Sequence, residues 1–339
     1  MSAPAGMPLP LLALAILLAA LMGFAVQRGA TCMVAAVEEW ISKRSARRSL
    51  AIGEASLWVL GGLAVLQLAG WARFMPQGFA VSRWTVLGGL LLGLGAAVNR
   101  ACVFGAVARF GNGEWAYALT PAGYFAGAAL GAMALPVWLP DARPVPLPGA
   151  AWLLQPGAKT ALVIVAGGAG LWMLWRLVQP LGSPGDSNDA SGLHRLARWR
   201  RSIWRPHEAT LVIGLSFVLL LGLAGRWTYI ELIGDAAHGQ WHDAGRRLLL
   251  LLALGAGAAR GGWTAHRFSP QPWRALLMAR CVLGGALMGL GAELVPGAND
   301  GLILLGLPLL WPHAWAAVAA MALSIAAWFG LRAFRARDS

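Results

Sequence analysis

Four polar segments in an otherwise apolar sequence contain the residues whose types could do chemistry. Two of them end in cysteine: Gln27-Arg28-Gly29-Ala30-Thr31-Cys32 and Asn99-Arg100-Ala101-Cys102. The third is Pro296-Gly297-Ala298-Asn299-Asp300-Gly301, and the fourth surrounds Arg226 and Glu231–Asp235. Each segment directly follows a long apolar run and interrupts a shorter one. Polar groups in such places are costly, which makes them candidates for function.

The thiols of Cys32 and Cys102 have the most specific chemistry of these groups. A thiol is a weak, soft hydrogen-bond donor that suits a polarisable sulfur atom better than an oxygen anion. A single buried cysteine is normally a packing residue, but two cysteines in matching polar contexts favour a path that handles sulfur. Packing remains the alternative for both. Cys281, beside Arg280, lies outside this pattern and is interpreted as a packing residue or an exit-side thiol.

The charged and amide side chains of these segments fit an anion path. The N-termini of broken helices carry a partial positive charge that attracts anions, and Arg28 and Arg100 would add to it. Arg28 and Cys32 are four residues apart and would share one face of a continuous helix. The alternative for Arg28 is an ion pair with Glu38 or Glu39. The predicted pathway residues are Cys32, Cys102, Arg28, Asn99, Arg100, Asn299 and Asp300.

Two carboxylates, Glu293 and Asp300, lie in or beside the last glycine-rich apolar run. One interpretation is that they are buried hydrogen-bonding residues. The other is that they bind a coupling proton, since ionisable groups inside a membrane commonly form proton relays.

The elements that position these residues are membrane helices. The chain has 339 residues, of which 58% are hydrophobic and 12% charged, against roughly 25% charged residues in soluble domains. The apolar runs are continuous rather than alternating, so they predict helices rather than a barrel. We expect nine spans near 8–26, 50–71, 84–98, 117–139, 158–180, 208–224, 244–259, 275–294 and 312–331. Shorter runs at 27–39, 101–111, 226–238 and 297–306 predict re-entrant helices.

The distribution of charge predicts the orientation. With the N-terminus in the periplasm and the C-terminus in the cytoplasm, most of the 27 Lys and Arg residues fall in cytoplasmic segments, as the positive-inside rule requires. This rule also explains the net charge of +13, so we expect no nucleic-acid partner. Many of the 18 Trp residues lie at span ends, where an interfacial belt forms at the lipid bilayer.

An internal repeat links the two parts of the chain. Gly93-Leu94-Gly95-Ala96 matches Gly289-Leu290-Gly291-Ala292, and the same offset aligns Gly105 with Gly301. The two copies would run in opposite directions, which predicts two inverted pseudo-symmetric halves, an architecture of many transporters. We expect a single membrane domain with half-repeats at 1–139 and 208–339, joined by a linking span and cytoplasmic linker at 140–207.

The segments GFAVQRGATCMVAA, GLLLGLGAAVNRACVFGA and GALMGLGAELVPGANDGLILLGLP resemble those of the YeeE/YedE family of sulfur-compound transporters. The resemblance implies thiosulfate uptake across a bacterial inner membrane, with cysteines at an hourglass centre passing the anion along by S–H contacts. Cys32 and Cys102 match the first-half positions. In the second half, Gly297-Ala298-Asn299-Asp300 stands where family members with a thiosulfate pathway have a Gly-Gly-Cys context. Because some relatives carry a fused sulfur-carrier domain, a small cytoplasmic sulfur-carrier protein is an implied partner.

Two other functions stay open from the residues alone: transport of a different small anion, and a membrane sulfurtransferase or oxidoreductase with a reactive cysteine. The sequence shows no cofactor motif, so we expect a protein that is not an enzyme and needs no cofactor. The spacing of His238, His242 and Asp243 is the nearest approach to a metal-binding set, and we expect no metal there.

Overall fold

A computed structural model describes residues 7–29, 32–71, 78–139, 141–142, 144–147, 158–178, 204–225, 227–241 and 243–335. These residues form helices, and their only β-type pairing is an isolated bridge between Phe79 and Pro146. Among the described residues, nine helices are long: α1 (Leu9–Gly29), α3 (Arg47–Leu68), α4 (Arg83–Asn99), α6 (Leu119–Trp138), α7 (Lys159–Val178), α9 (Pro206–Ala224), α11 (Ala244–Thr264), α12 (Ala275–Leu294) and α14 (Pro312–Arg335).

Short helices follow four of the long ones. They are α2 (Met33–Lys43), α5 (Val103–Gly111), α10 (Tyr229–Ala237) and α13 (Ala298–Gly301), which continues into the π-helical turn η3 (Leu302–Gly306). Three of them lie within segments for which the sequence predicted a short helix, and α2 begins within the predicted segment 27–39 but continues to Lys43. A 3-10 turn, η1 (Trp115–Ala118), precedes α6. Arg226, which belonged to the fourth polar segment, lies outside the described residues.

All nine predicted spans coincide with a long helix, which confirms the all-helical prediction. By length and composition, seven described segments can cross a membrane: Leu9–Lys43, Arg47–Leu68, Arg83–Gly111, Trp115–Trp138, Pro206–Ala224, Ala275–Leu294 and Pro312–Arg332. Two of the predicted spans are not in this set: the described apolar part of α7, Lys159–Trp175, is shorter, and α11 is not among the seven. The protein is therefore a multi-pass membrane protein, while the number of nine spans remains a prediction.

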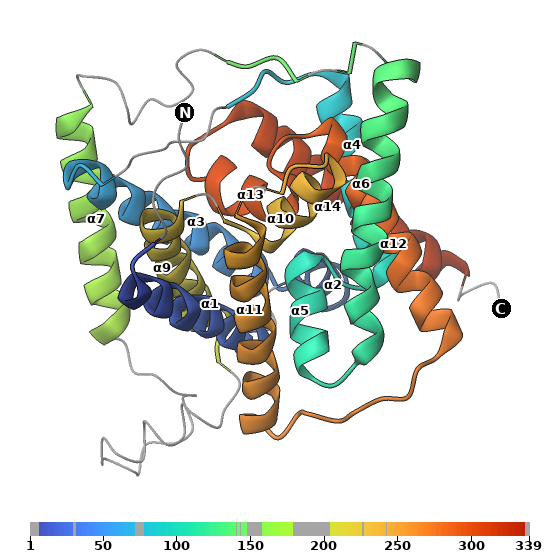
Figure 1. The fold of residues 1–339 in the computed structure, drawn as a ribbon, viewed down its shortest axis with the longest axis horizontal. Helices are drawn as coiled ribbons and strands as arrows, with labels where there is room; N and C mark the ends of the chain where they lie inside the picture. The colour runs from blue at the N-terminus through green and yellow to red at the C-terminus, as the bar shows by residue number, and fades with distance from the viewer. Residues whose placement is uncertain are drawn as a thin grey trace.

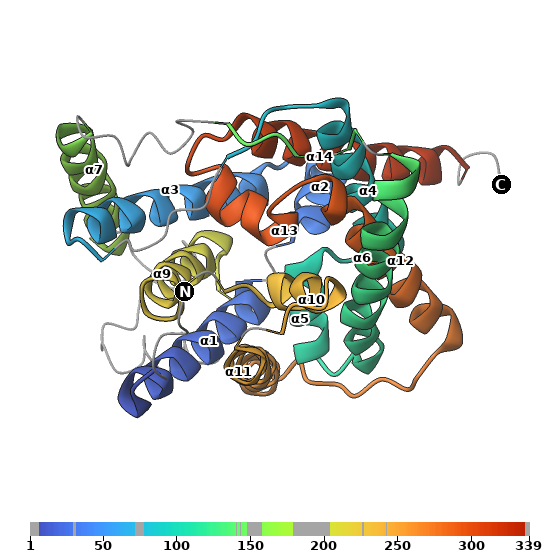
Figure 2. The same ribbon diagram turned by 45° about the horizontal axis from the view of Figure 1, so that its top comes forward.

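The long helices form two groups with the short helices between them (Figures 1 and 2). In one group α1 packs against α9 and α11, and α3 packs against α7 and α9. In the other, α4 packs against α12 and α14, and α12 packs against α6. Helix α5 contacts α1 and α11, α10 contacts α6 and α11, and α2 contacts α3, α4 and α14. Helices α2 and α10 thus connect the two groups, and each group contains helices from both ends of the chain.

Glycine lets the helices of the second group approach closely. A methyl group added at Gly89 or Gly93 would collide with the α14 backbone at Ala317 or Met321. The repeat-related positions behave alike, because a methyl group at Gly285 or Gly289 would collide with the α6 backbone. In a membrane the hydrophobic effect does not drive helices together, and stripes of small residues instead let the helix backbones pack closely. The glycines aligned by the sequence repeat therefore do the same work in two different helix pairs.

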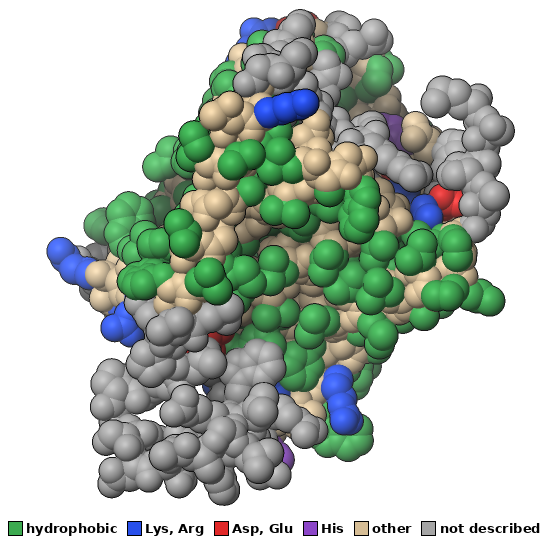
Figure 3. Space-filling view, turned by 90° about the vertical axis from the view of Figure 1, so that its left-hand side faces the viewer, with side chains coloured by type: hydrophobic (Ala, Val, Ile, Leu, Met, Phe, Trp, Pro, Cys, Tyr) green, Lys and Arg blue, Asp and Glu red, His purple; other side chains and the backbone are tan. Residues whose placement is uncertain are grey.

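The outer surface is apolar in the way that lipid requires. Leu171 of α7 is 71% exposed, Met133 of α6 is 77% exposed and Leu283 of α12 is 60% exposed. Figure 3 shows hydrophobic side chains spread over the face that carries α7, with Lys and Arg near its margins. Soluble proteins rarely expose such a continuous apolar surface. Exposed tryptophans at or just beyond helix ends, including Trp71, Trp138 and Trp241, suit membrane interfaces.

Candidate functional site

The two cysteines of the first half meet at the starts of two short helices. Cys32 is the N-cap residue of α2 and Cys102 is the N-cap residue of α5, and both are buried in extended backbone. The backbone N–H of Cys102 donates a hydrogen bond to Sγ of Cys32 over 3.2 Å. Residues 70 positions apart thus bring two soft sulfur atoms to two helix N-termini, where the partial charge is positive.

Gly105 in the first turn of α5 leaves the space that the thiol of Cys32 occupies. A Cβ atom at position 105 would lie 2.6 Å from Cys32 Sγ and 3.1 Å from Ala101 Cβ, well inside the 3.5–4.0 Å of an ordinary contact. At the repeat-related position, Gly301, a Cβ atom would have no neighbour within 4 Å. Cys32 Sγ can therefore occupy its position beside Cys102 only because residue 105 has no side chain.

Asn99 holds the turn that leads to Cys102. It is fully buried, its Nδ2 donates to the Ala101 carbonyl over 2.9 Å, and its Oδ1 accepts from Thr120 Oγ1 over 3.2 Å. Its backbone carbonyl accepts from the Tyr117 hydroxyl over 3.1 Å. Arg100 ends α4 in the left-handed conformation with φ 59°, as C-terminal residues of helices often do. Asn99, predicted to line the pathway, has its amide occupied by this turn and so positions Cys102.

The second half contributes hydroxyl and carboxyl groups opposite the thiols. The Tyr229 hydroxyl, in the first turn of α10, donates to the Val103 carbonyl over 2.6 Å. The N-cap residue Thr228 accepts from the N–H of Glu231 over 3.1 Å, and Thr228 and Asp300 line the same small cavity. Burial is the main reason that the pKa of Asp300 is raised, and the nearby Glu231 carboxylate raises it further. The start of α10 thus connects the start of α5 to α13.

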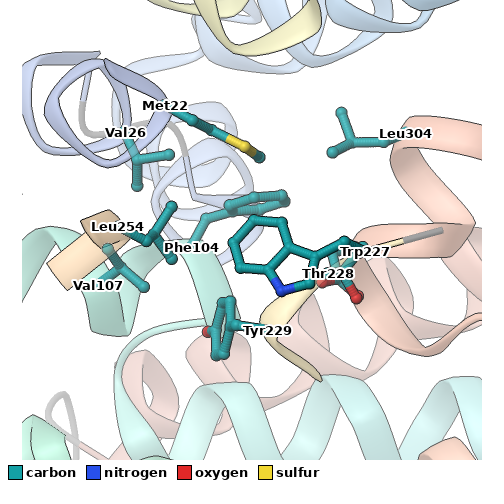
Figure 4. A pocket seen from close by; sticks show the side chains of 10 residues that line it. Met22, Val26, Phe104, Val107, Trp227, Thr228, Tyr229, Leu254 and Leu304 are labelled. Carbon is teal, nitrogen blue, oxygen red and sulfur yellow. The ribbon is translucent and has the colours of Figure 1, made fainter. Parts of the chain in front are cut away.

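A small cavity lies between these helices, with a volume of about 10 Å³. That is at the lower limit for a single water molecule. Phe104, Trp227, Tyr229 and other mostly apolar side chains point toward it from α1, α5, α11 and the segments that begin α10 and follow α12 (Figure 4). The carboxyl group of Asp300 also lines it. In this structure the centre is therefore closed to an ion the size of thiosulfate.

The structure changes the interpretation of Arg28. Helix α1 ends at Gly29, and Cys32 begins α2 in extended backbone, so the expectation that Arg28 and Cys32 share a helix face is wrong. Arg28 is fully buried, its Nη2 donates to Thr264 Oγ1 over 2.7 Å, and its guanidinium lies 4.9 Å from the Phe24 ring centre. The predicted partner Glu39 instead forms an ion pair with Arg48 over 3.1 Å.

The remaining predicted residues divide between two environments. Asn299 is 1% exposed, and neither atom of its amide has a hydrogen-bond partner among the described residues. Arg100 is exposed and lines a hollow at the end of α4, apart from the central cavity. Glu293 contacts His238 of the α10 C-terminus, with Oε2 3.0 Å from Nε2. His242 of the weak metal-binding pattern lies outside the described residues.

Cys281 packs away from the other two cysteines. It belongs to a small buried cluster with Ala101, Ala106, Ala116 and Tyr117. This environment fits the packing interpretation. Because Cys281 is buried without contacting the Cys32–Cys102 pair, it provides a natural control for substitution of the pair.

Three residues of the centre were not predicted from the sequence: Gly105, which leaves space for a thiol, and Thr228 and Tyr229, which form the polar start of α10. The sequence does contain a pattern that could have pointed to Thr228, because Thr followed three residues later by Glu is typical of a helix N-terminus. No local sequence pattern could have pointed to Tyr229, because its hydrogen-bond partner Val103 is 126 residues away.

An all-helical membrane protein with short helices that begin at buried thiols beside a narrow central cavity has the architecture of a membrane transporter. Comparison with known families agrees: the family model described as sulphur transport matches residues 28–327, and the chain belongs to this family.

Two curated relatives are similar over a shorter segment. The probable transporter YedE of Salmonella typhimurium is 27% identical over 163 residues, which is 41% of this chain and 40% of the relative. The probable transporter YedE of Escherichia coli strain K12 is 26% identical over 158 residues, 40% of this chain and 39% of the relative. The matched segment spans about two fifths of each curated relative.

Proposed function

We propose that this protein takes up a small sulfur-containing anion across the bacterial inner membrane, with thiosulfate as the first candidate substrate. The observation that carries the proposal is the pair of buried cysteines at the N-termini of α2 and α5, joined by the hydrogen bond from Cys102 N–H to Cys32 Sγ. The helix termini attract the anion, and the thiols offer weak donors to its terminal sulfur. Sulfate has no such sulfur atom, so it competes poorly with thiosulfate in this mechanism.

The packing of the helices supports an inverted-repeat architecture. When α1–α6 are exchanged for α9–α14 in order, the contact of α4 with α14 becomes that of α12 with α6, and α3 with α9 becomes α11 with α1. The contact of α2 with α14 likewise becomes that of α10 with α6. We propose half-repeats at 1–139 and 208–339, with the N-terminus in the periplasm and the C-terminus in the cytoplasm.

The closed centre implies movement during transport. A cavity of about 10 Å³ does not admit the anion, so the side chains around it must separate. The two helix groups are connected by α2 and α10, and movement of one group against the other would open the site as in other inverted-repeat transporters. Glu293 and Asp300 are the candidates for a coupling proton, and a small cytoplasmic sulfur-carrier protein is the proposed acceptor.

The test is uptake of radiolabelled thiosulfate by cells that lack other sulfur-anion importers. Cys32→Ala and Cys102→Ala should each reduce uptake about tenfold or more, whereas Cys281→Ala should leave it near wild type. Excess unlabelled sulfate should compete weakly. Equal uptake by the wild type and the Cys32→Ala, Cys102→Ala double variant, at matched membrane levels, refutes the thiol path. Persulfide on Cys32 or Cys102 during turnover would instead favour a sulfurtransferase.

A further inference from the structure

A second hollow, with a volume of about 330 Å³, lies where α4, α12 and α14 meet. Four of its lining residues are arginines: Arg100 just after α4, Arg280 in the second turn of α12, and Arg332 and Arg335 in the last turn of α14. The other lining residues are apolar apart from the indole of Trp328, and no carboxylate is among the described residues that line the hollow. Arginines far apart in sequence thus converge on one space.

These four guanidinium groups have no acidic partners in the described part of the chain. The ion pairs found there join other residues: Arg48 to Glu39, Arg83 to Asp141, Arg109 to Glu114, His238 to Glu293, Arg246 to Asp243, and Arg247 to Asp235. Positive charges around one hollow repel each other, and an anion bound between them would offset this repulsion by attracting each of them.

Helix dipoles account for only part of the cluster. Arg100, Arg332 and Arg335 lie at C-termini, where the partial negative charge favours cations. Arg280 lies close to the positive N-terminus of α12, so the dipole gives no reason for its place.

We propose that this hollow is a binding site for a phosphate-type tetrahedral oxyanion. Arginine guanidinium groups bind such oxyanions through paired N–H donors, and four of them from three helices surround a space open to solvent. The same chemistry is offered by two sources: the phosphate of an anionic lipid headgroup, and a free oxyanion in solution. The site is distinct from the thiol pair and does not depend on the proposed transport of thiosulfate.

The experiment compares the full-length wild type with an Arg280→Gln, Arg332→Gln variant in a neutral detergent. Native mass spectrometry after delipidation measures binding of added phosphatidylglycerol, and equilibrium binding of radiolabelled inorganic phosphate measures the free anion. An Arg267→Gln, Arg274→Gln variant is the matched control, because it removes the same charge from exposed residues that do not line the hollow. Thermal unfolding of all three proteins checks that they are folded.

We expect the Arg280→Gln, Arg332→Gln variant to bind one of the two probes at least about tenfold more weakly, because two charge-assisted hydrogen bonds are lost. The control variant should bind like the wild type. Loss of phosphatidylglycerol binding identifies a headgroup site, and loss of phosphate binding identifies a free-anion site. The binding should also weaken at high salt. If neither probe binds the wild type, or if both folded variants bind alike, the proposal is wrong. Thiosulfate uptake, measured separately, tests the thiol path alone.

Discussion

Substitution of Gly105 by alanine tests whether the position of the Cys32 thiol matters for transport. The new Cβ would lie 2.6 Å from Cys32 Sγ and 3.2 Å from Cys32 Cβ. An ordinary contact needs about 3.5–4.0 Å, so the thiol must move by about 1 Å or rotate to another side-chain conformation. Either change weakens the hydrogen bond that Sγ accepts from Cys102 N–H.

The size of the effect follows from the cost of overpacking. Adding a methyl group to a well-packed site costs about 1–3 kcal/mol, and each 1.4 kcal/mol corresponds to a factor of ten. If the strain falls mainly on the thiol, the fraction of molecules in which Cys32 Sγ keeps its native position falls by about five- to a hundredfold. We therefore expect thiosulfate uptake to fall by about tenfold, near the effect of Cys32→Ala.

The assay is initial-rate uptake of labelled thiosulfate at matched membrane levels, together with thermal unfolding of the purified proteins. Gly301→Ala is the matched control, since it makes the same change at the repeat-related position where a Cβ meets nothing within 4 Å. Gly301 has ordinary helical angles, φ −66° and ψ −36°, so its substitution should be neutral or slightly stabilising. Adding Cys32→Ala to Gly105→Ala should restore thermal stability without restoring uptake, because the clash is removed but the thiol is absent.

Two results would refute this reasoning. One is a folded Gly105→Ala protein that transports at the wild-type rate, which would mean that the thiol position is unimportant. The other is an equal loss of uptake in Gly301→Ala, which would point to helix flexibility rather than space for sulfur.

Other substitutions separate structural from functional polar groups. Asn99→Ala removes two side-chain hydrogen bonds and should lower the free energy of unfolding by about 1–3 kcal/mol, seen as earlier loss of folded protein in a thermal scan. Tyr229→Phe leaves the buried Val103 carbonyl without its donor, and its stability should fall within the same range when unfolding is followed by heat. Asn299→Leu replaces an amide without partners, so thermal stability should be kept or raised while uptake falls; a marked loss of stability would contradict this. Gly289→Leu should prevent α12 from packing on the α6 backbone, so little folded protein should be recovered by size-exclusion chromatography, whereas Gly167→Leu on α7, where a Cβ meets nothing, should be tolerated.

The sequence by itself determined the class of protein and the positions of its helices. Continuous apolar runs must become helices in lipid, because every backbone group needs an internal partner. Glycine and polar interruptions predicted the places of the four short helices, although α2 runs to Lys43, past the predicted end at residue 39. The cysteines at 32 and 102 were recognisable because the residues around them match at two places in the chain.

Only the tertiary structure decided which of these residues act together. Whether Cys32 lies beside Cys102 depends on how α2 and α5 are placed by helices from both ends of the chain, and no local pattern encodes such a contact. The same holds for Arg28, which the structure separates from Cys32 by ending α1 at Gly29 and pairs with Thr264. It holds again for Arg280, whose three arginine neighbours come from α4 and α14. Periodicity and composition report the environment of one segment, whereas a site is formed by the packing of several.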